Sequence, residues 1–227
     1  MSAQTTREFT TGPLYRAAQA VYSVLGPTAG FLIACLPFAA AIVAGHSTVA
    51  IAVGGVVIGP AWTALLYATR VIRADPERGP FTSFWRGYRL NWRQTLAVWL
   101  PYWLLLTAAG ADVASPASPL ALRAVIAVIA GISLLWMSAV LLIISRYAFR
   151  TRDVLRLGGY LLFGAPRSTV TDFALLIVAG ATIYLSSEFV LGLLAGVFAL
   201  FAIAGAQGAF ELVDARFTTD GRQDGAR

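Results

Sequence analysis

The amino-acid sequence predicts an all-α protein, a polytopic transmembrane bundle of about six spanning helices with one additional interfacial amphipathic helix. Three observations predict it: 58% of the 227 residues are apolar, only 12% are charged, and the mean hydropathy is +0.73. Average soluble domains contain about 25% charged residues. Because a soluble protein of this size could not cover its surface with so few charges, a soluble enzyme, a disordered chain and a disulfide-stapled domain are excluded.

Long stretches without charged side chains locate the spans. The longest covers residues 17–69, and its 53 residues are too many for one span of about 20 residues. The polar sequence Gly45-His46-Ser47-Thr48 is the natural place for a turn, and the Pro/Ser-rich segment 112–119 cannot continue a helix. The first four spans are therefore expected near residues 26–44, 49–72, 94–111 and 120–145.

The last apolar stretch must also fold back, because 40 helical residues would extend about 60 Å, about twice the hydrocarbon thickness. Ser186-Ser187-Glu188 is its polar interruption, which gives two further spans near 170–185 and 189–210. The sequence thus divides into a cytoplasmic N-terminal segment and lead-in (1–25), a transmembrane domain (26–212) and a flexible cytoplasmic tail (213–227).

The arginines indicate how these spans are oriented. All 17 basic residues are arginine, and with both termini in the cytoplasm sixteen of them fall on the cytoplasmic side and only Arg123 outside. Short cytoplasmic segments of membrane proteins carry such an excess of positive charge. We therefore expect both termini and the arginine-rich connections to be cytoplasmic.

Residues 80–93 are expected to form the interfacial amphipathic helix. Aromatic residues recur there at spacings of three and four and form one helical stripe, beside a face of arginines. Such a helix places aromatic rings in the headgroup boundary and guanidinium groups near anionic phosphates, and a docking surface for a cytoplasmic partner is the alternative. The candidate docking or lipid-contact residues are Phe84, Trp85, Arg86, Tyr88, Arg89, Asn91, Trp92, Arg93 and Gln94.

A second basic and aromatic segment follows the fourth span. Its end, Arg167-Ser168-Thr169, stands 74 residues after Arg93-Gln94-Thr95. This offset raises the hypothesis that the second and third spans and the fourth and fifth spans are related helix pairs, because internal repeats are common in membrane proteins. Chance similarity between apolar sequences is the alternative.

Four prolines lie inside the first three predicted spans. Each removes a backbone hydrogen bond and favours a helix kink. Such kinks either help static packing or mark a moving element whose freed carbonyls line a cavity. The candidate kink residues are Pro27, Pro37, Pro60 and Pro101.

Catalytic and metal-binding patterns are missing from the sequence. His46 has no neighbouring ligand, and Asp172, which we expect to pair with Arg167, lies at the edge of a predicted span. Ion-coupled carriers usually keep an ionisable residue inside the bundle, so this class loses support. The sequence predicts no enzymatic activity, no cofactor, no metal site and no nucleic-acid partner.

The stretch 59–95 resembles the YesL-like bacterial integral membrane proteins, a domain of unknown function. The resemblance rests on Gly59-Pro60-Ala61-Trp62, on Arg70 and Arg73, on Phe81-Thr-Ser-Phe84-Trp85 and on Asn91-Trp92-Arg93-Gln94-Thr95. In span order it extends over about residues 20–210. It implies a non-enzymatic, multi-pass protein of the bacterial inner membrane, often encoded beside sugar importers, and it carries over no catalytic residue.

The resulting expectation is an accessory or regulatory membrane component associated with carbohydrate uptake. Its expected partners are the lipid bilayer and a sugar importer complex, and homo-oligomerisation stays open. A small solute-conducting channel or transporter is the alternative function.

Overall fold

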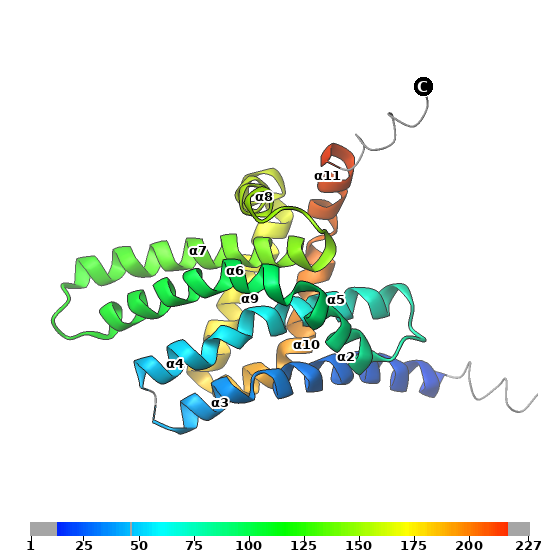
Figure 1. Cartoon of the computed structure of the whole chain (residues 1–227), viewed down its shortest axis with the longest axis horizontal. Helices are drawn as coiled ribbons and strands as arrows, with labels where there is room; N and C mark the ends of the chain where they lie inside the picture. Colours follow the sequence, from blue (N-terminus) through cyan, green and yellow to red (C-terminus); the bar gives the residue numbers. More distant parts are fainter. Residues whose placement is uncertain (1–12, 46, 218–227) are drawn as a thin grey trace, which may run out of the picture.

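The computed structural model describes residues 13–45 and 47–217, and every regular element in this part of the chain is helical (Figure 1). The predicted all-α class is therefore confirmed. In chain order the elements are α2 (Pro13–Ala34), α3 (Leu36–Val43), α4 (Thr48–Gly54), the 3₁₀ turn η1 (Gly55–Val57), α5 (Ile58–Ala74), α6 (Pro80–Ala114), α7 (Leu120–Arg146), α8 (Thr151–Gly164), α9 (Pro166–Leu185), α10 (Glu188–Gly205) and α11 (Gln207–Phe217).

Length and apolar composition identify five helical segments that could cross a membrane. They are Thr48–Ala74, Pro80–Ala114, Leu120–Arg146, Pro166–Leu185 and Glu188–Gly205. The pair Ala18–Ala34 and Leu36–Val43 makes a sixth if it is taken as one span bent by 56°. The chain is thus a multi-pass membrane protein by these criteria, in agreement with the expected number of about six spans.

The helices before α8 run side by side along the long axis of the molecule. The turn at 44–45 and the turn at 115–119 lie at one end, on the left of Figure 1, and the 75–79 loop lies at the other end. Helix α10 packs on α2, where Gly192 lies against Leu32 and Gly196 against Thr28. The start of α10 therefore points toward the same end as α3.

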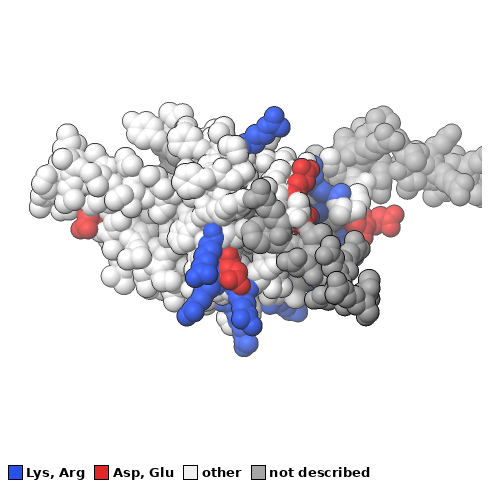
Figure 2. All heavy atoms as spheres, turned by 90° about the horizontal axis from the view of Figure 1, so that it is seen from above, with Lys and Arg blue, Asp and Glu red and all other residues white. Residues whose placement is uncertain are grey.

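Charged side chains concentrate at the end that holds the 75–79 loop. Figure 2 shows them over the middle and the right of one face, whereas the left-hand part is almost uncharged. Arg123 is the one arginine that the sequence predicts at the opposite end. It lies beside the 115–119 turn, where its Nη2 donates to the carbonyl of Ser115 at 2.5 Å. The bundle therefore has one arginine-rich end and one nearly neutral end.

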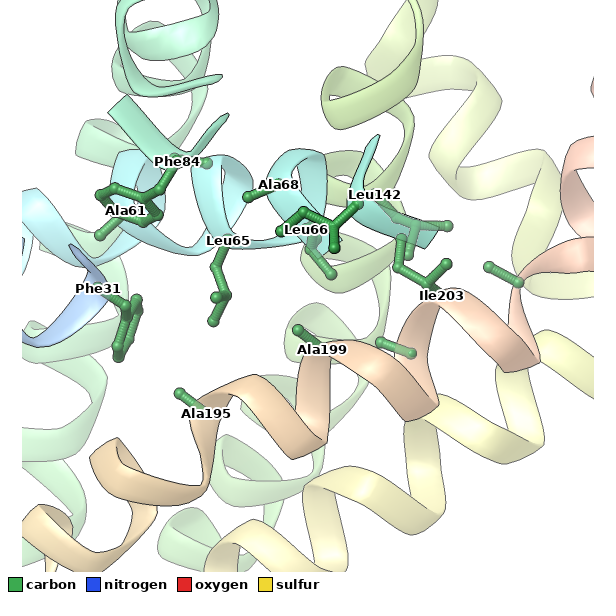
Figure 3. Packing of buried hydrophobic residues seen from close by; sticks show 14 of the residues in the cluster. Phe31, Ala61, Leu65, Leu66, Ala68, Phe84, Leu142, Ala195, Ala199 and Ile203 are labelled. Carbon is green, nitrogen blue, oxygen red and sulfur yellow. The ribbon is translucent and has the colours of Figure 1, made fainter. Parts of the chain in front are cut away.

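Helix α5 forms the centre of the larger core (Figure 3). Its residues Ala61, Ala64, Leu65, Leu66 and Ala68 are fully buried. Around them pack Phe31 of α2, Phe84 of α6, Leu142 of α7 and the α10 residues Ala195, Ala199 and Ile203. Alanines on α5 and α10 allow their backbones to approach closely, which is how helices associate where lipid is as apolar as the protein.

Two of the four prolines accompany helix breaks. Helix α3 begins just before Pro37, after the break at Cys35, and η1 separates α4 from α5 shortly before Pro60. A proline near a helix start costs the helix little free energy, because its missing N–H would have had no intrahelical acceptor. Helices α2 and α6 continue through Pro27 and Pro101.

The structure corrects several predicted boundaries. Helix α2 begins at Pro13, so residues 13–25 of the predicted lead-in belong to the first helix. At the other end α11 runs to Phe217 and Val213 is fully buried, so the predicted tail does not start at 213. Residues 1–12 and 218–227 and the turn residue His46 lie outside the described residues.

Residues 80–93 are helical, but they form no separate interfacial helix. They are the first part of α6, which continues to Ala114 without interruption. Its 35 residues correspond to roughly 50 Å, more than the hydrocarbon thickness of about 30 Å. Because no helix-ending signal stands near residue 94, residues 80–93 and the predicted third span form one continuous helix, which is longer than a single bilayer crossing requires.

Burial supports the hypothesis of related helix pairs. The buried residues of α8 are Val154, Leu157, Gly158 and Leu161. Subtracting the offset of 74 gives Pro80, Ser83, Phe84 and Gly87, which are the buried residues in the first part of α6. The two units differ where Pro166 starts a new helix, since α6 has Trp92 at the equivalent position.

Candidate functional site

The predicted docking residues lie on two faces of residues 80–93, the first part of α6, which we call the α6 extension. Phe84 is fully buried, its ring meets Trp85 edge-on at 5.5 Å between centroids, and Trp85 and Tyr88 pack against the same core. A side chain on Gly30 of α2 would collide with the Phe84 ring. The prediction that these aromatic rings lie among lipid headgroups is therefore wrong for Phe84, which faces protein.

The opposite face of the extension carries the exposed residues. Arg86, Arg89 and Arg93 are exposed, and they form no ion pair within the described residues. The Arg93 guanidinium lies over the Trp92 ring, 5.4 Å from its centroid, and Trp92 is itself exposed. This face, which we call the α6 basic face, offers three unpaired guanidinium groups on a helix that is fixed to the core.

Asn91, seven residues after Phe84, lies on the same face as Phe84, and both Asn91 and Gln94 are partly buried. The Nε2 atom of Gln94 donates to the carbonyl of Phe149 at 2.7 Å. Phe149 belongs to the connection between α7 and α8, so Gln94 fastens this connection to α6. Its role in the structure is to position the arginine-rich end.

Arg70 fastens the end of α7. Its Nη2 donates to the carbonyl of Ser145 at 3.2 Å, and its guanidinium lies 5.4 Å from the centroid of the Tyr67 ring. The last carbonyls of a helix have no intrahelical donor and carry partial negative charge. A guanidinium from α5 therefore stabilises the C-terminus of α7.

A third contact fixes α11 at the same end. Arg146 forms an ion pair with Asp214 at 2.7 Å, and the Tyr147 hydroxyl donates to the other carboxylate oxygen of Asp214 at 2.6 Å. The Arg146 guanidinium also covers the Phe210 ring, 4.5 Å from its centroid. Together, Arg146, Tyr147, Phe210 and Asp214 form what we call the α11 tether.

The α11 tether predicts a stability loss at alkaline pH. Burial, and then the hydrogen bond to Asp214, raise the pKa of Tyr147 above its ordinary value of 10.0. The folded chain holds this proton more tightly than the unfolded chain, so the contribution is fully present below about pH 10 and is lost as pH rises further. Melting temperatures measured between about pH 9 and pH 11 should fall more steeply for the natural sequence than for Tyr147→Phe. Equal slopes would contradict this assignment.

Two tryptophans of α6 fill the helix break between α4 and α5. The indole N–H of Trp99 donates to the Gly55 carbonyl and that of Trp103 to the Ala52 carbonyl, both at 3.0 Å. Side chains on Gly55 and Gly59 would collide with these rings. The glycines thus let the rings reach the backbone, and the indoles bond to carbonyls at the break.

Asp172 contacts a neighbouring helix. Ser138 on α7 donates its hydroxyl to the Asp172 carboxylate at 3.0 Å. The expected ion pair with Arg167 is wrong, because a spacing of five residues places two helical side chains about 140° apart. Within the described residues, no group of three or more His, Cys, Asp or Glu side chains could hold a metal ion.

One family model matches a segment that includes part of this site. Residues 31–113 match the family described as "Protein of unknown function, DUF624". The matched segment contains the stretch 59–95 and the α6 basic face. No curated protein and no solved structure matches the chain. The chain is thus a multi-pass helical membrane protein that is similar, over residues 31–113, to a family of proteins of unknown function.

Proposed function

We propose that this chain is a non-enzymatic accessory or regulatory membrane component that binds a cytoplasmic partner through the α6 basic face. The observation that carries the proposal is the set of three exposed arginines, without ion-pair partners in the described residues, on one face of a helix longer than a single bilayer crossing requires. Buried Phe84 on the reverse side fixes this helix to the core, so the backbone positions that carry the three arginines keep a constant spacing. A partner with an acidic surface complements such a face.

The more specific part of the proposal concerns the partner. The resemblance of residues 59–95 to YesL-like proteins supports a role beside a sugar importer in the bacterial inner membrane, with both termini in the cytoplasm. The uneven distribution of arginine supports the same orientation.

The proposed lack of enzymatic activity rests on the side chains that contact Asp172. Asp172 accepts a hydrogen bond from the Ser138 hydroxyl, but nucleophilic catalysis also requires a third group that orients such a pair, and within the described residues no further side chain bonds to either residue. Turnover of a substrate that disappears on Asp172→Ala, in a protein that still folds, would contradict this part of the proposal.

Solute conduction is less well supported. Broken spans are the feature that favours it, yet the carbonyls of Ala52 and Gly55 at one break bond to indole groups instead of lining an open path. Solute flux through liposomes that contain the purified chain alone, altered by Pro60→Ala, would favour conduction over docking.

The docking proposal predicts loss of a partner in a mild-detergent pull-down from native membranes. The variant Arg86→Gln/Arg89→Gln/Arg93→Gln should still insert but should recover no importer component. A matched control is Arg150→Gln/Arg152→Gln/Arg156→Gln, which removes three exposed arginines from the α7–α8 connection and α8. Recovery of the same components by both variants, or loss in both, would contradict a docking role for the α6 basic face.

A further inference from the structure

A cavity opens beside the α6 basic face, between the end of α5, the 75–79 loop and the first turns of α6. Its volume is about 320 Å³, and its lining includes Tyr67, Arg78, Ser83 and Arg86. Small-molecule sites usually measure about 300–1,000 Å³, so this cavity can hold a small polar group. It lies within the segment 31–113 and at the arginine-rich end of the bundle.

The polar side chains around this cavity mainly offer hydrogen-bond donors. Arg86 forms no ion pair within the described part of the chain, and Arg78 uses its Nε on Asp75 at 2.9 Å, which leaves its terminal nitrogens free to bind. A guanidinium group has five N–H donors and no acceptor. Two such groups at one cavity require an occupant that is rich in acceptor oxygens.

Ser83 is an independent indication of a ligand. Its side chain is only 6% exposed, it lines the cavity, and its hydroxyl makes no hydrogen bond to any described residue. Neighbouring Thr82, in contrast, donates its hydroxyl to the Gly79 carbonyl at 2.8 Å. The Ser83 hydroxyl oxygen is not among the fully buried atoms without a partner, so it is accessible from the cavity and can donate to a group bound there. Ser83 is thus a donor in place for a ligand.

The backbone adds to the positive potential. Helix α6 begins at Pro80, and its N-cap Gly79 provides no side-chain hydrogen bond to the first turn. The first N–H groups of a helix carry partial positive charge and bind anions when no side chain satisfies them. The 75–79 loop contains two carboxylates, Asp75 and Glu77; Asp75 is paired with Arg78, and neither carboxylate lines the cavity. The cavity therefore favours an anion over a cation.

We propose that this cavity binds the phosphate group of an anionic phospholipid headgroup. Phosphate offers the acceptor oxygens that Arg78, Ser83 and Arg86 require, and arginine binds it bidentately. A lipid is favoured as the source because Phe81, which is 42% exposed, packs edge-on against Trp85 beside the cavity-lining turn and presents an apolar surface for acyl chains. Arg86 belongs to both the cavity and the α6 basic face, but Arg89 and Arg93 do not line the cavity, so variants of these two residues separate the lipid site from protein docking.

Native mass spectrometry of the full chain in mild detergent tests the proposal. Phosphatidylglycerol should bind with one molecule retained per chain, and phosphatidylcholine should not compete at equal concentration. Arg86→Gln and Ser83→Ala should each raise the lipid concentration needed for half occupancy, roughly tenfold for Arg86→Gln. Arg86→Lys should bind better than Arg86→Gln, and Arg89→Gln, on the same helix but outside the cavity, should bind as the natural sequence does.

The outcomes separate the possible explanations. An equal loss with Arg86→Gln and Arg89→Gln would show diffuse attraction and overturn the site, as would equal binding of both lipids. Displacement of the lipid by glycerol 3-phosphate, with the same dependence on Arg86 and Ser83, would keep the phosphate site but overturn the lipid as its occupant. Because Ser83→Ala removes one atom from a cavity wall, its melting temperature shows whether reduced binding reflects misfolding. The pair Arg89→Gln/Arg93→Gln should lose the protein partner and keep the lipid, so the two proposals fail independently.

Discussion

Gly59→Ala is expected to lower the melting temperature of the purified protein, although alanine is the better helix former. The added methyl group would collide with the Trp99 ring, whose indole also bonds to the Gly55 carbonyl. Forcing extra volume into a packed contact costs about 1–3 kcal/mol, which corresponds to roughly 3–10 °C for a chain of this length. The measurement is thermal unfolding in detergent, followed by tryptophan fluorescence.

Gly110→Ala is the matched control for this prediction. Gly110 lies inside α6, and no atom lies within 4 Å of the position that its added methyl group would occupy. There the substitution should stabilise the protein by about 0.5–1 kcal/mol, because glycine is unfavourable in a helix interior. The two variants should therefore shift the melting temperature in opposite directions. Shifts of the same sign would contradict the close packing of α6 on the α4–α5 break.

Asp214→Ala is expected to release α11 from the end of α7. The substitution removes the acceptor for both Arg146 and Tyr147, so the α11 tether loses its ion pair and its hydroxyl hydrogen bond together. Local opening of α11 should become more frequent, and amide hydrogen exchange in Gln207–Phe217 should rise by roughly tenfold or more. Hydrogen-exchange mass spectrometry measures this effect.

Asp153→Ala is the control variant for Asp214→Ala. Asp153 is an exposed acidic residue in the first turn of α8, and it takes no part in the ion pair or the hydrogen bonds of the α11 tether. Its replacement should leave exchange in α11 unchanged. Unchanged exchange in Asp214→Ala would show instead that the buried residues Ala209, Phe210 and Val213 hold α11 without the ion pair, which would contradict the importance given to that pair.

The fold class and most turns could be predicted from the sequence because they depend on local composition. The charge-free stretches and the turns at 115–119 and 186–187 follow from the cost of charges and loops in a bilayer. The surroundings of residues 80–93 could not be predicted in this way. Helical periodicity correctly placed Phe84 on an apolar face, but lipid and protein are equally apolar, so the pattern could not show that this face meets α2 and α5.

The candidate site was predicted only in part, because its contacts join distant residues. Arg70 with Ser145, Gln94 with Phe149 and Arg146 with Asp214 are separated by 55 to 75 residues, and no local pattern announces them. One contact did leave a signal. Gly55 and Gly59 share a spacing of four with Trp99 and Trp103, as expected for two antiparallel helices that place small residues opposite large ones.

The central claim is that the arginine-rich end faces the cytoplasm, where a partner can reach the α6 basic face. Cysteine labelling with a membrane-impermeant maleimide tests it most directly, in a Cys35→Ala background with single cysteines at exposed positions. In intact preparations whose outer surface is the non-cytoplasmic side, Ser47→Cys and Ser186→Cys should react with the added reagent. Glu77→Cys and Arg152→Cys should react only after permeabilisation. Labelling of position 77 or 152 from outside, with protection of 47 and 186, would contradict the claim.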